Sequence, residues 1–128
     1  MWYRVRKRRR RTSVTKHYVT HKEQARELVL SRLEYFNQYY GLAWKRVSIR
    51  NQRTCWGSCT SLGNLNFNYK LLFLPPELRD YIIVHELCHL AELNHGRKFW
   101  DLVREQVPDY HTHKRALKII ERQGMTLS

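Results

Sequence analysis

Hydrophobic residues recur at helical spacing through residues 20–40, and charged residues fill the positions between them. This period predicts an amphipathic helix that buries one face. Gly41 follows the last hydrophobic position, where a residue that tolerates the left-handed conformation ends a helix. The first element that the pattern predicts is therefore one long helix.

Between residues 44 and 69 the pattern shortens to stretches typical of strands. Residues 44–50 and 53–60 are each predicted to form a strand, and turn residues at 61–64 separate them from a third. In that third stretch Leu65, Phe67 and Tyr69 alternate with asparagines, which is the pattern of a half-buried strand. These signals predict a small sheet of about three strands.

The asparagine face of the third stretch, formed by Asn64, Asn66 and Asn68, allows two interpretations. On an edge strand it would receive an extended substrate through backbone pairing, which makes few demands on the substrate's sequence. A polar face turned toward solvent explains the same alternation without any ligand. The sequence alone leaves both open.

The second half of the chain predicts helices. An apolar run at 71–74 ends at Pro75-Pro76, and a proline fits the first turn of the helix that follows. Hydrophobic periodicity extends this helix to about Asn94, and further helices are predicted at 97–106 and 110–123. The order of helix, short strands and then helices predicts an α+β fold.

The stretch His85-Glu86-Leu87-Cys88-His89 carries the most specific chemical signal in the chain. On a helix, the pattern H-E-x-x-H places two imidazoles one turn apart with a carboxylate beside them, which suits one metal ion. In a chain of this composition the pattern would arise by chance only roughly 0.02 times. A metal site is therefore a better explanation than two histidines that merely pack.

Two residues compete to be the third ligand of this metal site. Glu92 shares the helical stripe of the histidines but lies about 10 Å along the axis from His85, too far for ligands that bind near 2 Å. His95 lies between Asn94 and Gly96, which both tolerate the conformation that ends helices, so that it leaves the helix. We predict a site of His85, His89 and His95 whose fourth position is open to water, as in catalytic zinc sites.

Zinc in such a site makes water more acidic and polarises a peptide carbonyl. Glu86 points about 100° around the helix from His85, which suits a carboxylate that takes up the proton of the water without binding the metal. We expect Glu86 to be the general base of peptide hydrolysis. A third possibility is a zinc hydrolase that acts on a bond other than a peptide, which the motif does not exclude.

The length and charge distribution predict a single folded domain with a basic arm. The 128 residues carry a net charge of +13, and eight Lys and Arg with no acidic residue lie within residues 1–16. Residues 1–16 are predicted to be a flexible arm, and residues 17–128 to be the domain. No apolar run is long enough for a membrane span or a signal peptide. The odd number of cysteines, three, fits a reducing compartment, and the expected location is cytoplasmic.

The basic arm itself has two interpretations. It would anchor DNA or RNA through the phosphates without reading the base sequence, or it is a solvated tail. The residues that would make the nucleic-acid contacts are Arg4, Arg6, Lys7, Arg8, Arg9, Arg10 and Arg11.

A series of motifs between residues 44 and 118 is specific enough to indicate a family. The series is W-G-S-C at 56–59, G-N-L-N-F-N at 63–68, L-P-P at 74–76, Y-I-I-V-H-E-L-C-H-L at 81–90, N-H-G at 94–96, F-W at 99–100 and P-D-Y at 108–110. With these motifs the chain resembles the YgjP-like zinc metallopeptidases, a zincin group related more distantly to the SprT-like proteases. The resemblance implies a minimal zincin fold, one catalytic Zn²⁺ on the three histidines and a protein or peptide substrate. The SprT-like relatives make proteins bound to nucleic acid an attractive substrate class.

The sequence leaves open which group stabilises the oxyanion of the reaction. Tyr110, His111 and His113 are candidates, although exposed helix histidines would explain two of them, and Tyr69 and Arg97 compete for the role. The leading prediction is a zinc-dependent metallopeptidase. The alternative is a non-catalytic nucleic-acid-binding module in which zinc only ties elements together.

Overall fold

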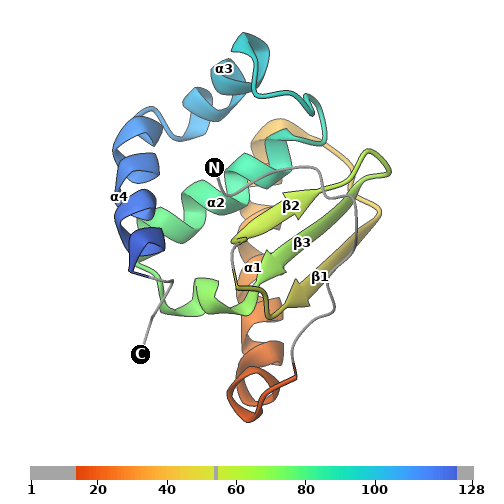
Figure 1. The fold of residues 1–128 in the computed structure, drawn as a ribbon. Helices are drawn as coiled ribbons and strands as arrows, with labels where there is room; N and C mark the ends of the chain where they lie inside the picture. The colour runs from red at the N-terminus through yellow and green to blue at the C-terminus, as the bar shows by residue number, and fades with distance from the viewer. Residues whose placement is uncertain (1–13, 54, 124–128) are drawn as a thin grey trace.

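The computed structural model describes residues 14–53 and 55–123. In these residues the elements follow the order α1 (Lys16–Tyr40), β1 (Arg46–Arg50), β2 (Gly57–Cys59), β3 (Asn64–Asn68), the 3₁₀ helix η1 (Tyr69–Phe73), α2 (Pro76–Cys88), α3 (Arg97–Gln106) and α4 (Tyr110–Arg122) (Figure 1). The predicted α+β fold is confirmed. The predicted nucleic-acid residues of the basic arm lie outside the described residues.

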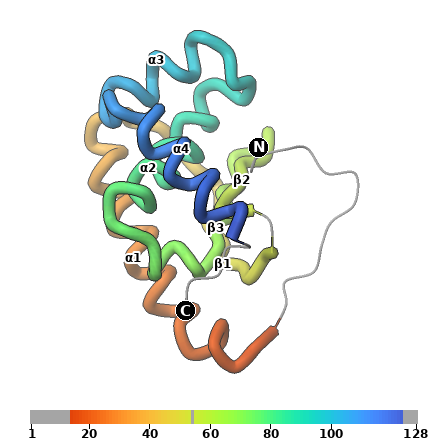
Figure 2. Tube along the Cα trace, turned by 60° about the vertical axis from the view of Figure 1, so that its left-hand side comes forward, coloured from red at the N-terminus to blue at the C-terminus, as the bar shows by residue number. Residues whose placement is uncertain are grey.

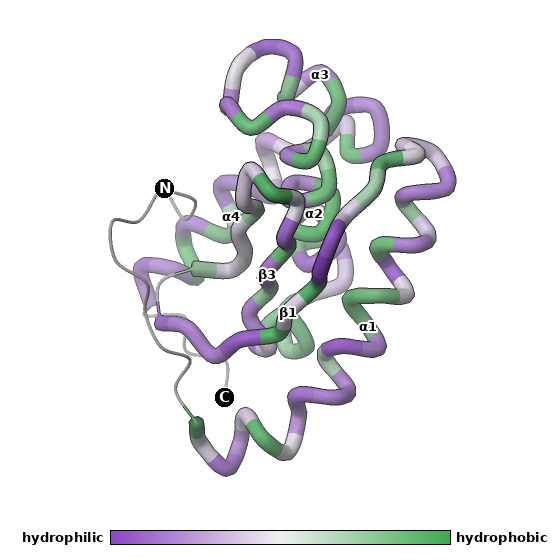
Figure 3. The backbone as a smooth tube through the Cα atoms, turned by 90° about the vertical axis from the view of Figure 1, so that its right-hand side faces the viewer, coloured by the Kyte–Doolittle hydropathy of each residue, from purple (hydrophilic) through white to green (hydrophobic). Residues whose placement is uncertain are grey.

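Helix α1 begins four residues earlier than predicted because its first turn is anchored in two ways. The hydroxyl of Thr15 accepts a hydrogen bond from the backbone N–H of Tyr18 at 3.1 Å, and the Tyr18 hydroxyl donates to the carbonyl of Ile49 at 2.8 Å. Gly41, with φ of 63°, ends the helix as predicted. Hydrophobic and hydrophilic positions alternate along this helix, as Figure 3 shows.

The three strands form a mixed sheet in the order β1-β3-β2, in which β3 runs parallel to β1 and antiparallel to β2. Because β3 is the central strand, both sides of its backbone are already paired. The interpretation of Asn64, Asn66 and Asn68 as a substrate-binding edge strand is therefore wrong. The side chains of Asn66 and Asn68 have structural partners instead: the Asn66 amide donates to the Ser58 hydroxyl at 3.2 Å, and the buried Asn68 amide donates to the carbonyl of Cys55 at 3.0 Å.

Helix α2 lies in the middle of the molecule, between the sheet on one side and α3 and α4 on the other (Figures 1 and 2). Eight consecutive residues, 81–88, are buried, which is the signature of a helix covered on every side. Pro76 occupies its first turn, as predicted. The polar side chains of His85 and Glu86 therefore sit in the interior of the protein.

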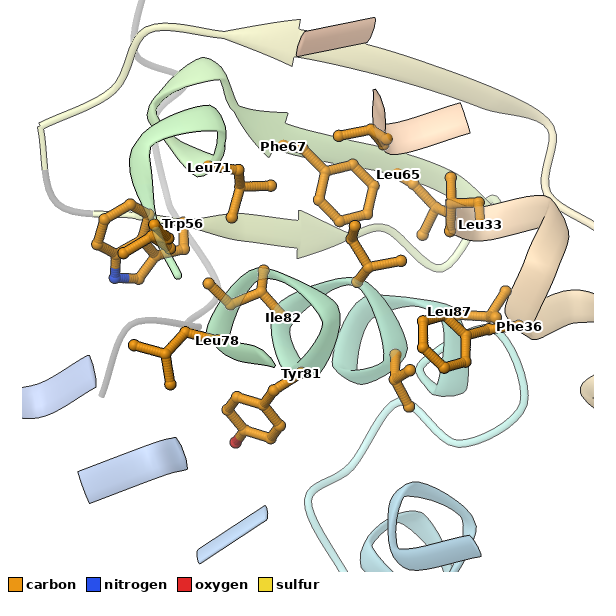
Figure 4. Close-up of a cluster of buried hydrophobic side chains, with 14 of the residues drawn as sticks. Leu33, Phe36, Trp56, Leu65, Phe67, Leu71, Leu78, Tyr81, Ile82 and Leu87 are labelled. Atoms are coloured by element: carbon orange, nitrogen blue, oxygen red, sulfur yellow. The ribbon is translucent and has the colours of Figure 1, made fainter. Parts of the chain in front are cut away.

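The hydrophobic core joins the sheet to this central helix. Leu65 and Phe67 of β3 point toward α1 and α2, where Leu33, Phe36 and Ile82 meet them (Figure 4). A bidentate ion pair adds a polar link, because both guanidinium donors of Arg32 on α1 reach the carboxylate of Asp80 on α2 at 3.0 Å. None of the helices in the described ranges has the length and apolar character that crossing a membrane requires.

Candidate metal centre and active site

The chain reverses direction directly after α2. Two i→i+3 hydrogen bonds of 3.0 Å, from the Leu90 N–H to the Leu87 carbonyl and from the Ala91 N–H to the Cys88 carbonyl, replace the helical pattern. The helix thus ends at Cys88, and the prediction that it continues to about Asn94 is wrong. Because the helix ends early, the segment that follows it can fold back and place His95 beside the helix.

The reversal brings the three predicted ligands together. The Nε2 atoms of His85 and His89 lie 3.2 Å apart, those of His85 and His95 3.2 Å, and those of His89 and His95 3.1 Å. Nitrogen ligands of one tetrahedral zinc ion lie about 3.3–3.4 Å apart when each binds at 2.0–2.1 Å. The donor set therefore fits a zinc ion and could hold one.

Burial keeps the three imidazoles in the neutral form that metal binding requires. It lowers the pKa of His85 well below its ordinary value, that of His89 to about 4, and also that of His95. The Nδ1 of His89 lies 2.9 Å from the backbone carbonyl of Glu92, so that this nitrogen donates its proton there and the Nε2 lone pair faces the cluster. Glu92 serves the site through its backbone, and its side chain is not part of the group.

Aromatic rings from α3 and α4 stack around the histidines and fix the orientation of the imidazole rings. Phe99 stacks on His89 with ring centroids 4.2 Å apart, and Trp100 stacks on His95 at 5.9 Å. Tyr110 in turn stacks on Trp100 at 4.7 Å. This apolar wall fixes ring orientation and excludes water from one side of the cluster.

Glu86, the residue after the first histidine, lies in a different environment between α2 and β2. It is fully buried, and neither carboxyl oxygen has a hydrogen-bond partner among the described residues. Burial raises its pKa well above the ordinary value. An unpartnered buried carboxyl is costly for stability, which makes it a candidate functional group.

Gly57 on β2 makes room for this carboxyl. A Cβ at this position would lie 3.0 Å from the Cγ of Glu86 and 3.1 Å from the carbonyl oxygen of Asn66. The sequence places Gly57 within the predicted strand at 53–60, where it weakens the strand signal. A glycine inside a strand also signals close approach by another group, and that signal would have pointed to this contact.

The oxyanion candidates are dispersed around the site. Tyr110 is buried against Trp100, His111 is exposed, and His113 lies 3.4 Å from the Asp109 carboxylate. Tyr69 is hydrogen-bonded to His17 at 2.7 Å, and the Arg97 side chain is 94% exposed. A small cavity lies beside His85 and His95, and none of these five residues lines it.

Lys114 on α4 does line that cavity, together with Tyr81, and sequence reasoning missed it. Its position follows no spacing rule relative to the histidines, because it depends on how α4 packs against α2.

A three-histidine cluster that could hold a metal ion, beside a buried carboxyl, is typical of metal-dependent hydrolases. Comparison with known families specifies it further. A family model described as "YgjP-like, metallopeptidase domain" matches residues 3–119, so that the chain belongs to the YgjP-like metallopeptidase family and is a zinc metallopeptidase.

Two solved structures share the fold. The metallopeptidase zymogen of Pyrococcus abyssi abylysin superposes with a TM-score of 0.62 and 24% sequence identity, covering 73% of this chain and 93% of that chain. The metallopeptidase zymogen of Methanocaldococcus jannaschii jannalysin gives a TM-score of 0.60 and 23% identity, covering 74% of this chain and 96% of that chain. No curated protein matches the chain.

Proposed function

We propose that this protein cleaves peptide bonds with one zinc ion held by His85, His89 and His95, and with Glu86 as the general base. The observation that carries the proposal is the group of three imidazole Nε2 atoms, 3.1–3.2 Å apart, next to α2, which also carries a buried carboxyl with no hydrogen-bond partner among the described residues. When bound, zinc supplies a Lewis acid that polarises the peptide carbonyl and makes water more acidic.

Glu86 takes up the proton of the attacking water on a carboxylate oxygen and passes it to the leaving amine. Burial raises the pKa of this carboxyl. A general acid–base group works best when its pKa lies near the working pH, because it then both accepts and donates a proton. Gly57 and the buried surface of α2 hold the side chain in place, and the absence of hydrogen bonds to other described residues leaves its oxygens available.

The substrate lies along β2 in this proposal. Among the described strands, β2 has only β3 as a neighbour, and Gly57 places its backbone directly against Glu86. An extended peptide that adds to this edge is bound through its backbone, with little demand on its sequence. This position replaces the central strand that the asparagine pattern suggested.

Glu86→Gln tests the proposal, because glutamine keeps the shape of the side chain but cannot act as a base. We expect the variant to bind zinc in a 1:1 ratio, as the wild type does, and to hydrolyse casein or a quenched fluorescent peptide about 10²–10⁴ times more slowly. Unchanged hydrolysis would remove Glu86 from its role. Stoichiometric zinc without hydrolysis in the wild type would favour the non-catalytic binding module.

We propose the cytoplasm as the location of the protein. We propose nucleic-acid-associated proteins as its substrate class. The support is the odd number of cysteines and the eight basic residues in residues 1–16. Removal of residues 1–12 should then lower DNA affinity and flatten its dependence on salt concentration. Equal affinity of the full and shortened chains for DNA would exclude this role.

A further inference from the structure

A cavity of about 40 Å³ opens beside the histidine cluster. Helices α2, α3 and α4 all contribute to its wall, which consists of Tyr81, His85, His95, Trp100, Lys114, Leu117, Lys118 and Glu121. Because His85 and His95 belong both to the cavity and to the metal site, a substrate side chain next to the cleaved bond can reach into it. One water molecule needs a cavity volume of roughly 10–15 Å³, so that this larger cavity has room for a short side chain.

Lys114 brings a positive charge to this mostly apolar wall. Its ammonium lies over the ring of Trp100, 4.8 Å from the centroid, and the side chain is half-buried. His85, His95 and Lys114 line the same cavity, so that the ammonium belongs to the wall that two of the predicted ligands share. Across residues 14–53 and 55–123, no carboxylate forms an ion pair with Lys114.

Lys118, one turn further along α4, differs from Lys114 in its exposure. Its side chain is exposed to solvent, whereas that of Lys114 is half-buried over Trp100. Among the residues that the structure describes, Lys114 is the half-buried cation of the cavity wall and forms no ion pair with a carboxylate, so that a substrate carboxylate can pair with it.

We propose that the cavity selects an acidic side chain, aspartate above all, on the substrate residue next to the cleaved bond, and that Lys114 binds its carboxylate. This inference rests on the proposed peptidase function and names a substrate class for it. The aromatic and aliphatic walls accept the short apolar stem, and the ammonium meets the carboxylate at its end. A charge-assisted hydrogen bond of this kind corresponds to a preference of about 10- to 100-fold for aspartate over asparagine.

The test uses peptides that are identical except for one residue on either side of the cleaved bond, which is Asp, Asn, Leu or Lys. We expect the wild type to have the highest kcat/KM for the Asp peptide. Lys114→Met should abolish the preference for Asp over Asn, and Lys114→Glu should invert it in favour of Lys. The matched control is Arg115→Glu, which makes the same charge change at the next residue, exposed and outside the cavity wall, and should keep the preference.

A binding measurement separates the selectivity from catalysis. Calorimetric titration of the zinc-loaded Glu86→Gln variant with the same peptides should show tighter binding of the Asp peptide, and addition of Lys114→Met should remove the difference at equal zinc content. Equal kcat/KM for the Asp, Asn and Lys peptides, or an equal effect of the Lys114→Glu and Arg115→Glu changes, would overturn the inference. Asp-selective binding without hydrolysis by the wild type would support the cavity and refute the proposed peptidase function.

Discussion

His85 and Glu86 are neighbours in the chain, yet their side chains lie in opposite kinds of environment. The histidine side of α2 is closely partnered, with Nε2 atoms 3.1–3.2 Å apart and with Phe99 stacked on His89. The carboxyl side, toward β2, is buried without any hydrogen bond to the described residues. The histidine side can thus hold a metal ion, whereas the carboxyl side keeps its oxygens available for a reaction.

The difference shows why the site is on α2. A helix with one exposed face can bury only one set of side chains, but α2 is covered by the sheet on one side and by α3 and α4 on the other (Figure 2). Two successive residues can therefore enter two buried environments. The same covering keeps His85 neutral and raises the pKa of Glu86, because burial disfavours the charged form of each.

The largest expected effect comes from breaking the histidine side. His89→Ala removes one of three ligands and the ring that Phe99 covers, so that zinc binding and peptide hydrolysis should both fall to background. The measurement is zinc content by atomic absorption together with peptide turnover. As a control, His111→Ala removes an exposed imidazole and should change neither. Full zinc occupancy in His89→Ala would contradict the assigned ligand set.

Crowding the carboxyl side should have the next largest effect. In Gly57→Ala the new methyl group would lie 3.0 Å from the Cγ of Glu86 and 3.1 Å from a backbone oxygen, so that the side chain or the strand must shift. We expect a loss of about 1–3 kcal/mol in the free energy of unfolding and roughly 10- to 100-fold slower hydrolysis, with zinc retained. Gly96→Ala is the matched control, because a Cβ there meets nothing within 4 Å.

The raised pKa of Glu86 predicts a pH dependence of stability in the metal-free protein. Above the unfolded-state pKa, near 4.5, the unfolded chain loses this proton before the folded protein does, so that the free energy of unfolding decreases. The stability of the wild type relative to Glu86→Gln should therefore fall as pH rises from about 4.5 toward the folded-state pKa. The slope is at most about 1.4 kcal/mol per pH unit.

Urea unfolding of both chains between pH 4 and 8, in the presence of a chelator, measures this difference. Glu34→Gln, at an exposed position of α1, controls for the removal of one carboxylate. A wild type that gains stability relative to Glu86→Gln with rising pH would mean that the carboxyl has a stabilising partner.

The smallest effect should come from the aromatic support of the histidines. Phe99→Leu keeps an apolar residue but removes the ring stacked on His89, so that we expect about 1 kcal/mol less stability and about tenfold weaker zinc binding. A competitive zinc titration measures the affinity. Phe73→Leu, the same change on η1, should leave zinc affinity unchanged, and equal weakening by both substitutions would refute a specific role for Phe99.

Local patterns in the sequence predicted most of the fold and the meeting of the three histidines. Gly41 and Pro76 act through their own backbone conformations, and the i, i+4 spacing of His85 and His89 is a property of any helix. These features depend on neighbours in the chain. A single sequence therefore suffices to predict them.

The errors and omissions concern contacts between distant segments. The alternation around Asn66 shows that one face of β3 is buried, but only the pairing with both β1 and β2 makes that strand central. The end of α2 depends on where His95 must return, and Lys114 reaches the cavity only because α4 packs against α2. No periodicity in the chain encodes these placements.

The proposed function depends on three imidazoles that hold one zinc ion. Anomalous diffraction at the zinc edge, from crystals grown with zinc, locates the ion. We predict one strong peak at about 2.0–2.1 Å from the Nε2 atoms of His85, His89 and His95, with no protein side chain at the fourth position. A zinc ion bound elsewhere, a His95 ring turned away from the pair, or a fourth protein ligand would contradict it.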